Sequence, residues 1–187
     1  SLEDVCLEMS SLGKGDIREP FIEVTYPNGS STTDMVFDRA EIIQGKEEYD
    51  TLPGSYDDNG EVEQLVIYLK DRNYNLTLEL HYYVYEKCNV ITRSAKFINE
   101  STDDVSVRLE RLMSMQLDLN ESDYELSFFN GAWAREMNRS RIPIRAGKYV
   151  NESVTGTSSN RANPFFMIGR SSTTEDYGEC YGFNLIY

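Results

Sequence analysis

The feature that most constrains the fold of this chain is a period-two alternation of apolar and polar side chains in two long segments. In 74–85 every second residue is apolar: Tyr74, Leu76, Leu78, Leu80, Tyr82 and Val84. In 105–119 the apolar face consists of Val105, Val107, Leu109, Met113, Met115, Leu117 and Leu119, and only Arg111 interrupts it. Successive side chains of a strand point to opposite faces, whereas a helix would scatter these residues around its axis. Both segments are therefore predicted to be long, half-buried β-strands.

Shorter strands are predicted between turn signals such as Pro27-Asn28-Gly29 and Asp57-Asp58-Asn59-Gly60. They are expected at 21–26, 35–43, 62–69, 90–98, 124–129, 132–137, 164–170 and 181–187. Strands with one polar and one apolar face favour two antiparallel sheets packed together. No segment has a helical period and no internal repeat interrupts the chain, so we predict one all-β antiparallel β-sandwich domain over 1–187.

Two other stretches carry expectations about function and completeness. Residues 146–163 are rich in Ser, Thr, Asn and Gly, which predicts a long loop of the kind that is often functional. The last residues, 181–187, read as an apolar strand with no polar tail after it, and chain termini are usually exposed and loosely held. We therefore expect the natural polypeptide to continue beyond Tyr187.

Charge and cysteine content restrict the classes of partner. The 32 acidic and 18 basic residues give a net charge of −14, which repels phosphate backbones and anionic lipids, so neither nucleic acid nor a membrane is an expected partner. Cys6, Cys88 and Cys180 are sparse and lack C-x-x-C spacing, which argues against a disulfide framework and against a zinc site. Reduced, buried thiols in a cytoplasmic protein are the expectation, with no metal and no cofactor.

A search for catalytic groups finds few candidates. The only histidine, His81, falls on the polar face of its strand and is expected at the surface, so a Ser-His-Asp triad or a metal site lacks parts. The acidic pairs Asp57-Asp58 and Asp103-Asp104 lie in predicted turns, where solvated carboxylates are common. One segment is more informative: Trp133, the only tryptophan, lies close to Arg135 and Glu136. An indole and a guanidinium can together hold a sugar, and the alternative is a core Trp beside a surface ion pair.

Six motifs, in order along the chain, resemble the N-terminal domain of glycoside hydrolase family 36 α-galactosidases. The segment 131–136 is similar to that family's GAWARE motif. The others are Gly15-Asp16-Ile17-Arg18-Glu19-Pro20; Tyr85-Glu86 with Asn89-Val90-Ile91-Thr92-Arg93-Ser94-Ala95; Leu112-Met113-Ser114-Met115-Gln116-Leu117-Asp118; Gly156-Thr157-Ser158-Ser159 with Asn163-Pro164-Phe165; and Gly178-Glu179-Cys180-Tyr181-Gly182-Phe183. The sequence departs from the family pattern at Asn160, where the family usually has His, and at Asn89, where it usually has Asp. Any role that needs an imidazole at position 160 is therefore in doubt.

The resemblance implies a specific division of labour. Members of this family are retaining enzymes that release terminal α-galactose from sugars such as melibiose and raffinose. Their N-terminal "supersandwich" packs on a (β/α)8 barrel, which supplies two catalytic Asp residues from KWD-type and SDD-type motifs. Neither motif occurs here, and Ser101-Thr102-Asp103-Asp104 lies in the sandwich region. The resemblance therefore implies a sandwich that is incomplete at both ends and inactive alone, in a bacterial, cytoplasmic, oligomeric parent enzyme.

The expected role is to shape the interface with the catalytic barrel and with neighbouring subunits. The interface or sugar-proximal candidates are Trp133, Arg135, Glu136, Ser158, Ser159 and Asn163, and no catalytic residue is expected. A free-standing sugar-binding β-sandwich that uses Trp133 and Arg135 is the alternative. A purely structural surface domain is a third reading, which a coding sequence ending at Tyr187 would favour.

Overall fold

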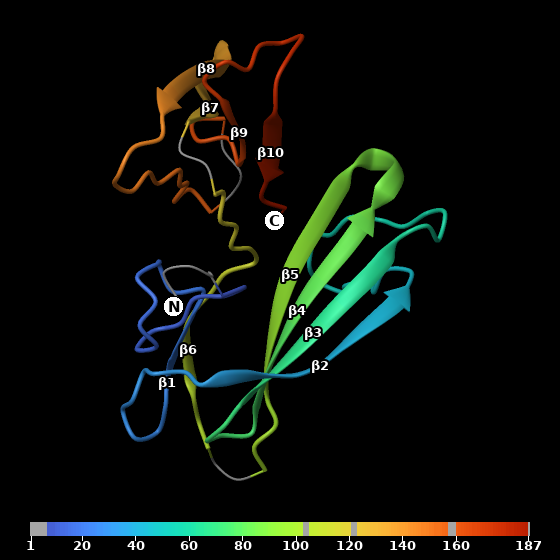
Figure 1. Cartoon of the computed structure of the whole chain (residues 1–187), viewed down its shortest axis with the longest axis vertical. Helices are drawn as coiled ribbons and strands as arrows, with labels where there is room; N and C mark the ends of the chain where they lie inside the picture. The colour runs from blue at the N-terminus through green and yellow to red at the C-terminus, as the bar shows by residue number, and fades with distance from the viewer. Residues whose placement is uncertain (1–6, 103–104, 121–122, 157–159, 187) are drawn as a thin grey trace. The chain divides into compact units, whose positions relative to one another are not determined.

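The computed structural model describes residues 7–102, 105–120, 123–156 and 160–186, and these residues form an all-β, antiparallel fold. Among them are ten strands and one short 3-10 helix, η1 (Glu86–Cys88), with no α-helix (Figure 1). The strands are β1 (Ile22–Thr25), β2 (Met35–Gln44), β3 (Glu63–Asp71), β4 (Leu76–Tyr85), β5 (Val90–Asn99), β6 (Arg108–Leu112), β7 (Tyr124–Ala132), β8 (Arg135–Pro143), β9 (Phe165–Arg170) and β10 (Cys180–Asn184). In this part of the chain, no helix has the length and apolar character needed to cross a membrane.

Contacts group the chain into two compact units. The first unit comprises Ser1–Glu48 and Ser55–Asp118, and the second comprises Tyr49–Gly54 and Leu119–Tyr187. Each unit has its own antiparallel sheet with its own buried side chains, and the prediction of one sandwich domain over 1–187 stays a prediction.

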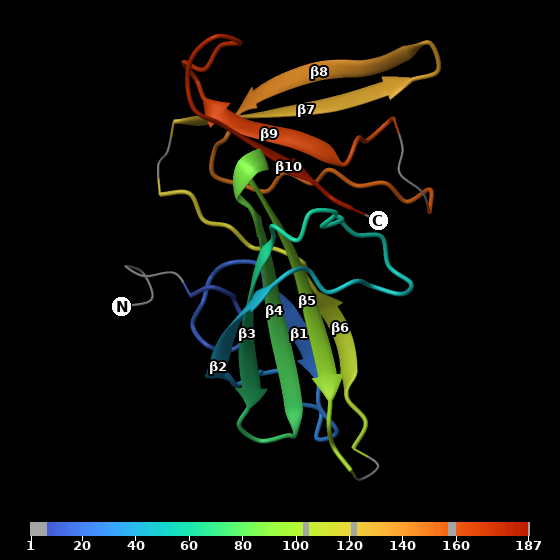
Figure 2. The same ribbon diagram turned by 90° about the vertical axis from the view of Figure 1, so that its right-hand side faces the viewer.

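In the first unit, a four-stranded sheet with the order β2-β3-β4-β5 carries the core on one face. The alternation read from 74–85 is confirmed there, since Leu76, Leu78 and Leu80 of β4 are all buried. The two-stranded ribbon β1-β6 supplies the other side of this core, with Ile22 and Val24 fully buried against the same cluster (Figure 2). This is the two-layer packing expected of a sandwich.

The prediction of a strand over 105–119 is wrong at both ends, because β6 spans only Arg108–Leu112. The pairing of β1 with β6 shifts between Glu23 and Val24, so an extra residue of β6 breaks the alternation. The shift brings Leu112 rather than Arg111 opposite Ile22, and Val107 and Leu112 pack against the core, while Leu109, which pairs with Val24 before the shift, is 41% exposed. Beyond Leu112, the Met113 backbone N–H still donates to the Phe21 carbonyl, and contacts that involve side chains hold Gln116 and Asp118.

The second unit contains a sheet with the order β10-β9-β7-β8. Tyr124, Leu126 and Phe128 of β7 alternate inward and are buried, as period two predicts. The predicted strand at 132–137 is wrong, because Trp133 and Ala134 form the turn that joins β7 to β8. The described part of 146–163 contains no strand of these sheets, as expected of a loop.

Two local expectations about side chains also fail. Cys88 and Cys180 are free thiols but exposed, so the prediction that they are buried is wrong, and Cys6 lies outside the described residues. Asp57 and Asp58 do lie in a turn, where the Asp57 carboxylate accepts the backbone N–H of Glu61. The other acidic pair, Asp103-Asp104, lies outside the described residues.

Candidate functional site

The tip of the β7-β8 hairpin presents the predicted site residues to solvent. Ala132 pairs with Arg135, so only Trp133 and Ala134 form the connection, and Ala134 has a left-handed backbone at φ +60°. The Trp133 side chain is 90% exposed, which rules out the alternative of a core Trp. The predicted neighbouring ion pair is not formed either. The Glu136 carboxylate instead accepts the backbone N–H of Ala134 at 2.9 Å.

Close backbone packing beneath the tip explains why a glycine precedes it. A Cβ added to Gly131 would lie 2.6 Å from the carbonyl oxygen of Arg135 and 2.9 Å from the Cα of Glu136. It would also lie 3.3 Å from the carbonyl oxygen of Asn160, which places the start of the 160–163 segment against the base of the hairpin. No side chain fits there without moving backbone, so the glycine sets the shape of the tip.

The structure brings Asn163 to the same hairpin. Its backbone N–H donates to the carbonyl of Phe129 on β7, and its Nδ2 lies 3.4 Å from the sulfur of Met137 on β8. Its Oδ1 accepts the N–H of Phe165 at 2.9 Å, which starts β9. Asn163 therefore ties the loop to β7, β8 and β9, while Ser158 and Ser159 lie outside the described residues.

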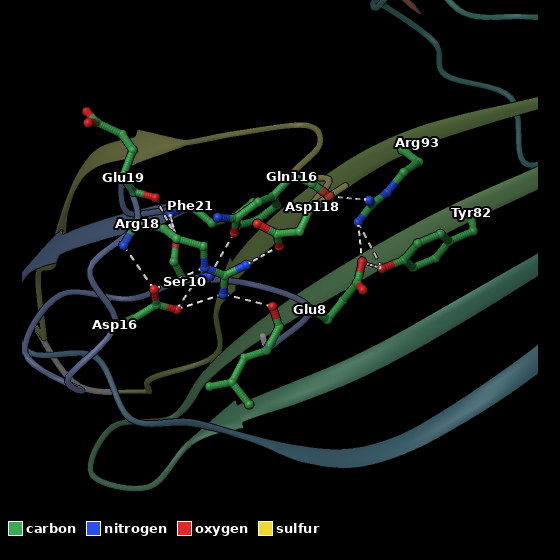
Figure 3. Close-up of polar contacts among 11 residues, drawn as sticks. Glu8, Ser10, Asp16, Arg18, Glu19, Phe21, Tyr82, Arg93, Gln116 and Asp118 are labelled. Carbon is green, nitrogen blue, oxygen red and sulfur yellow. Dashed lines mark hydrogen bonds and ion pairs between the residues drawn. The ribbon is translucent and has the colours of Figure 1, made fainter. Parts of the chain in front are cut away.

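A second cluster, which includes several motif residues and was not predicted as a site, is centred on Arg18 (Figure 3). The Arg18 guanidinium donates to both carboxylate oxygens of Asp16, to the carboxylate of Asp118 and to the carbonyl of Leu7. The side chains of Arg18 and Asp16 are only 16% and 9% exposed. Hydrogen bonds from Arg18 lower the pKa of Asp16, and the same contacts raise the pKa of Arg18.

Arg93 of β5 forms the other half of this cluster (Figure 3). Its guanidinium donates to Glu8 at 2.6 Å, to the backbone carbonyl of Gln116 at 2.8 Å and to the hydroxyl of Tyr82 at 2.9 Å. Burial and a hydrogen bond to Glu8 raise the pKa of Tyr82. Ser10 also belongs to this cluster, because its backbone N–H donates to the side-chain oxygen of Gln116.

The guanidinium groups of Arg18 and Arg93 have a structural role, because they connect segments that are distant in sequence. Residues 7–21 and 113–118 are held to each other through Arg18, and 113–118 is held to β5 through Arg93. Each carboxylate of the cluster is neutralised by an arginine, so none is left as a free base or nucleophile. The signal in the sequence was the presence of Arg18, Arg93 and Asp118 inside quoted motifs, although no spacing rule could have paired them.

The prediction that His81 lies at the surface is wrong. His81 is 4% exposed, and its Nδ1 lies 2.9 Å from Nε2 of Gln64 while its Nε2 lies 3.0 Å from the carboxylate of Glu79. Since an amide nitrogen can only donate, Nδ1 accepts and Nε2–H donates to Glu79. β4 is an inner strand, so side chains on neighbouring strands flank its polar face, and alternation alone cannot show this.

We expect His81→Leu to lower the free energy of unfolding by about 2 kcal/mol, because a buried amide and a nearly buried carboxylate lose their partner. Urea denaturation followed by fluorescence measures this change. His81→Gln keeps a donor and an acceptor and is expected to lose less. Equal stability of His81→Leu and the unchanged chain would contradict a structural role for the histidine.

Comparison with known proteins identifies the family. Residues 1–187 match the model of the glycosyl hydrolase family 36 N-terminal domain. The chain is 37% identical to the α-galactosidase AgaA of Geobacillus stearothermophilus over 188 residues, which is all of this chain and 26% of that protein. It is 32% identical to α-galactosidase 2 of Hypocrea jecorina, covering 96% of this chain and 24% of the relative. The chain thus spans about a quarter of the length of these relatives.

Solved structures of similar proteins share the fold. The α-galactosidase from Lactobacillus brevis superposes with a TM-score of 0.91 at 40% identity, covering 96% of this chain and 24% of that one. A variant of AgaA solved in complex with raffinose superposes with a TM-score of 0.88 at 37% identity, covering 93% and 24%. The match over the full length and the shared antiparallel fold show that this chain belongs to the glycosyl hydrolase family 36 N-terminal domain family.

Proposed function

We propose that this chain is the non-catalytic N-terminal part of a retaining α-galactosidase and shapes the interface with the catalytic (β/α)8 barrel and with neighbouring subunits. The observation that carries the proposal is the match of all 187 residues to a domain family while the chain spans about a quarter of relatives named α-galactosidase. The parent is then a bacterial, cytoplasmic hydrolase of terminal α-galactosides such as melibiose and raffinose. It forms homo-oligomers.

The requirements of the retaining hydrolysis mechanism support the proposal that this chain is inactive by itself. Such hydrolysis needs two carboxyl groups about 5 Å apart, one as nucleophile and one as acid and base. In the Arg18–Arg93 cluster, the carboxylates of Asp16, Asp118 and Glu8 are each paired with a guanidinium group, and hydrogen bonds from Arg18 lower the pKa of Asp16. The exposed hairpin tip has one carboxylate, Glu136, which caps its own turn.

We expect the purified chain to release no chromophore from a chromogenic α-galactoside above the buffer blank. A full-length α-galactosidase in the same plate serves as the positive control. Turnover that copurifies with the chain and scales with its concentration would contradict the proposal.

Trp133 is exposed, and Arg135, two residues on, has no ion pair among the described residues, which favours one second candidate, a free-standing sugar-binding module. Tryptophan rings and guanidinium groups suit the apolar face and the hydroxyls of a sugar. Titration calorimetry with galactose, melibiose and raffinose separates the candidates, because an interface domain produces little or no heat. A saturable heat that disappears in Trp133→Ala would favour the second candidate.

A further inference from the structure

The four-stranded sheet of the first unit has buried side chains on its polar face as well as on its core face (Figure 1). On the polar face, β3 carries Gln64 and Val66, and β4 carries His81 directly opposite Val66. Gln64 is only 3% exposed, and Val66 and His81 are buried beside it. The outward face of an antiparallel sheet is ordinarily in contact with water. Burial of an amide and an imidazole there indicates a constructed polar site.

A cavity of about 490 Å³ opens on this face. Each of the four strands contributes to its lining, for example through Ile43, Tyr68, Glu79 and Lys96. Residues 45–47, which follow β2, also line it. They are held there because the Gly45 N–H donates to the carbonyl of Val62 and the Lys46 ammonium lies over the ring of Tyr83. Sites for small molecules occupy about 300 to 1,000 Å³, and every lining residue belongs to the first unit.

The cavity contains hydrogen-bond acceptors that have no donor. The Nε2 of Gln64 donates to His81, but its Oε1 has no hydrogen-bond partner among the described residues. In that part of the chain, the only fully enclosed side-chain oxygen or nitrogen without a partner belongs to Thr33, so the Oε1 of Gln64 is open to the cavity. Glu79 accepts the His81 N–H through Oε2, which leaves its Oε1 as a second acceptor. Nearly buried acceptors cost free energy unless a ligand or water donates to them.

The charges of the lining select a neutral ligand. Two lysines, Lys46 and Lys96, balance two glutamates, Glu47 and Glu79, so an anion or a cation would meet a like charge. The Lys96 ammonium lies 3.9 Å from the Glu79 carboxylate, beyond hydrogen-bond distance, so its N–H groups can donate to a ligand. Hydroxyl groups both donate and accept, which suits open acceptors beside an ammonium donor. A sugar ring also has an apolar face to place against Val66.

We propose that this cavity binds a neutral monosaccharide, whose hydroxyls donate to Gln64 and Glu79 and accept from Lys96. The site is separate from Trp133, which belongs to the second unit, and it does not depend on the proposed role at interfaces. An open cavity with few hydrogen bonds should bind with a dissociation constant in the millimolar range. Binding this weak produces little heat in the calorimetric titration described above, so the two tests stay distinct.

Nuclear magnetic resonance of the isotope-labelled chain tests the site directly. Galactose and glucose are the probes, each added up to about 100 mM to reach saturation of a millimolar site. With at least one of them, the side-chain amide signals of Gln64 and the backbone amide signals of 64–68 and 79–81 should shift and saturate. Inorganic phosphate at the same concentrations should leave these signals in place, because the cavity has no excess of positive charge.

Large side chains on β2 provide a matched pair of variants. Ile43→Trp places an indole in the cavity, because Ile43 lines it, and should raise the dissociation constant at least about tenfold. Ile42→Trp adds the same atoms to the neighbouring residue, whose side chain points to the other face of the strand, and should change it less than about twofold. Ile42 and Ile43 are both exposed, so both variants should fold.

A second pair tests the donor. Lys96→Met should raise the dissociation constant at least about threefold, whereas Lys70→Met, at an exposed lysine of β3 outside the cavity, should leave it unchanged. Thermal unfolding of all variants checks that the fold is kept. Gln64 signals that move with neither sugar overturn the proposal, and so does sugar binding that Ile43→Trp leaves intact. Movement of the same signals with phosphate overturns the neutral class of ligand. None of these outcomes affects the hydrolysis test of the proposed function.

Discussion

Arg18→Met is expected to lower the free energy of unfolding by about 3 kcal/mol, because it removes the cation that neutralises Asp16 and Asp118. The methionine keeps much of the length of the side chain, so the loss reports charge and hydrogen bonds more than packing. Asp16 is only 9% exposed and would be left as a nearly buried carboxylate without its main partner. Denaturation in urea, followed by circular dichroism, gives the change.

Arg72→Met is the matched control for this experiment. Arg72 also pairs with an aspartate, Asp34, but at 3.6 Å and with a side chain that is 65% exposed. Exposed ion pairs contribute little to stability, so Arg72→Met should lower the free energy of unfolding by less than about 0.5 kcal/mol. If both variants lost the same amount, burial of the Arg18 cluster would not explain its contribution.

Lowering the pH should reduce the difference in the free energy of unfolding between Arg18→Met and the unchanged chain. The pKa of Asp16 is lowered in the folded state, so its contribution is fully present above the unfolded pKa of about 4 and is lost as the pH falls through the lowered value. In Arg18→Met the Asp16 carboxylate has lost its cation, and protonation removes the cost of burying its charge. Stability curves at several pH values should therefore converge below about pH 4, whereas parallel curves would contradict the assignment.

The sequence predicted those strands whose packing is uniform along their length. β4 was predicted almost to the residue because it is an inner strand whose inward side chains all meet the same core. The strand predicted over 105–119 is longer than β6, because the bulge depends on the register with β1, which lies more than 80 residues away in the sequence. The β7-β8 turn was missed because Trp133 and Ala134 are not turn formers, and close packing around Gly131 determines the turn instead.

The sequence identified several residues of the candidate site, but it did not reveal which of them contact one another. Trp133, Arg135 and Asn163 were found by resemblance to family motifs, and the structure shows that the segments of Trp133 and Asn163 meet. The pairing of Arg18 with Asp118 spans 100 residues, so no local pattern could reveal it. The burial of His81 was equally hidden, since alternation assigns a side chain to a face and says nothing of what covers that face.

Leu78→Ala is expected to cost about 3 kcal/mol, the usual loss when a fully buried leucine leaves a cavity. Leu78 has no accessible surface and lies in the cluster that joins β4 to Ile22 and Val24 of β1. The surrounding strands are held by ladders on both sides of β4, so they have little freedom to collapse into the space. Thermal and urea unfolding should both show the loss.

Leu109→Ala tests whether Leu109 is only partly buried, as the structure shows, or lies in the core, as simple alternation implies. Unbroken alternation over 105–119 would place Leu109 in the core beside Val107, and its truncation would then cost nearly as much as that of Leu78. In the structure Leu109 is 41% exposed, so the loss of unfolding free energy should be below about 1 kcal/mol. Because both variants remove the same atoms, the difference between them measures burial alone. Equal losses would contradict the partial exposure of Leu109.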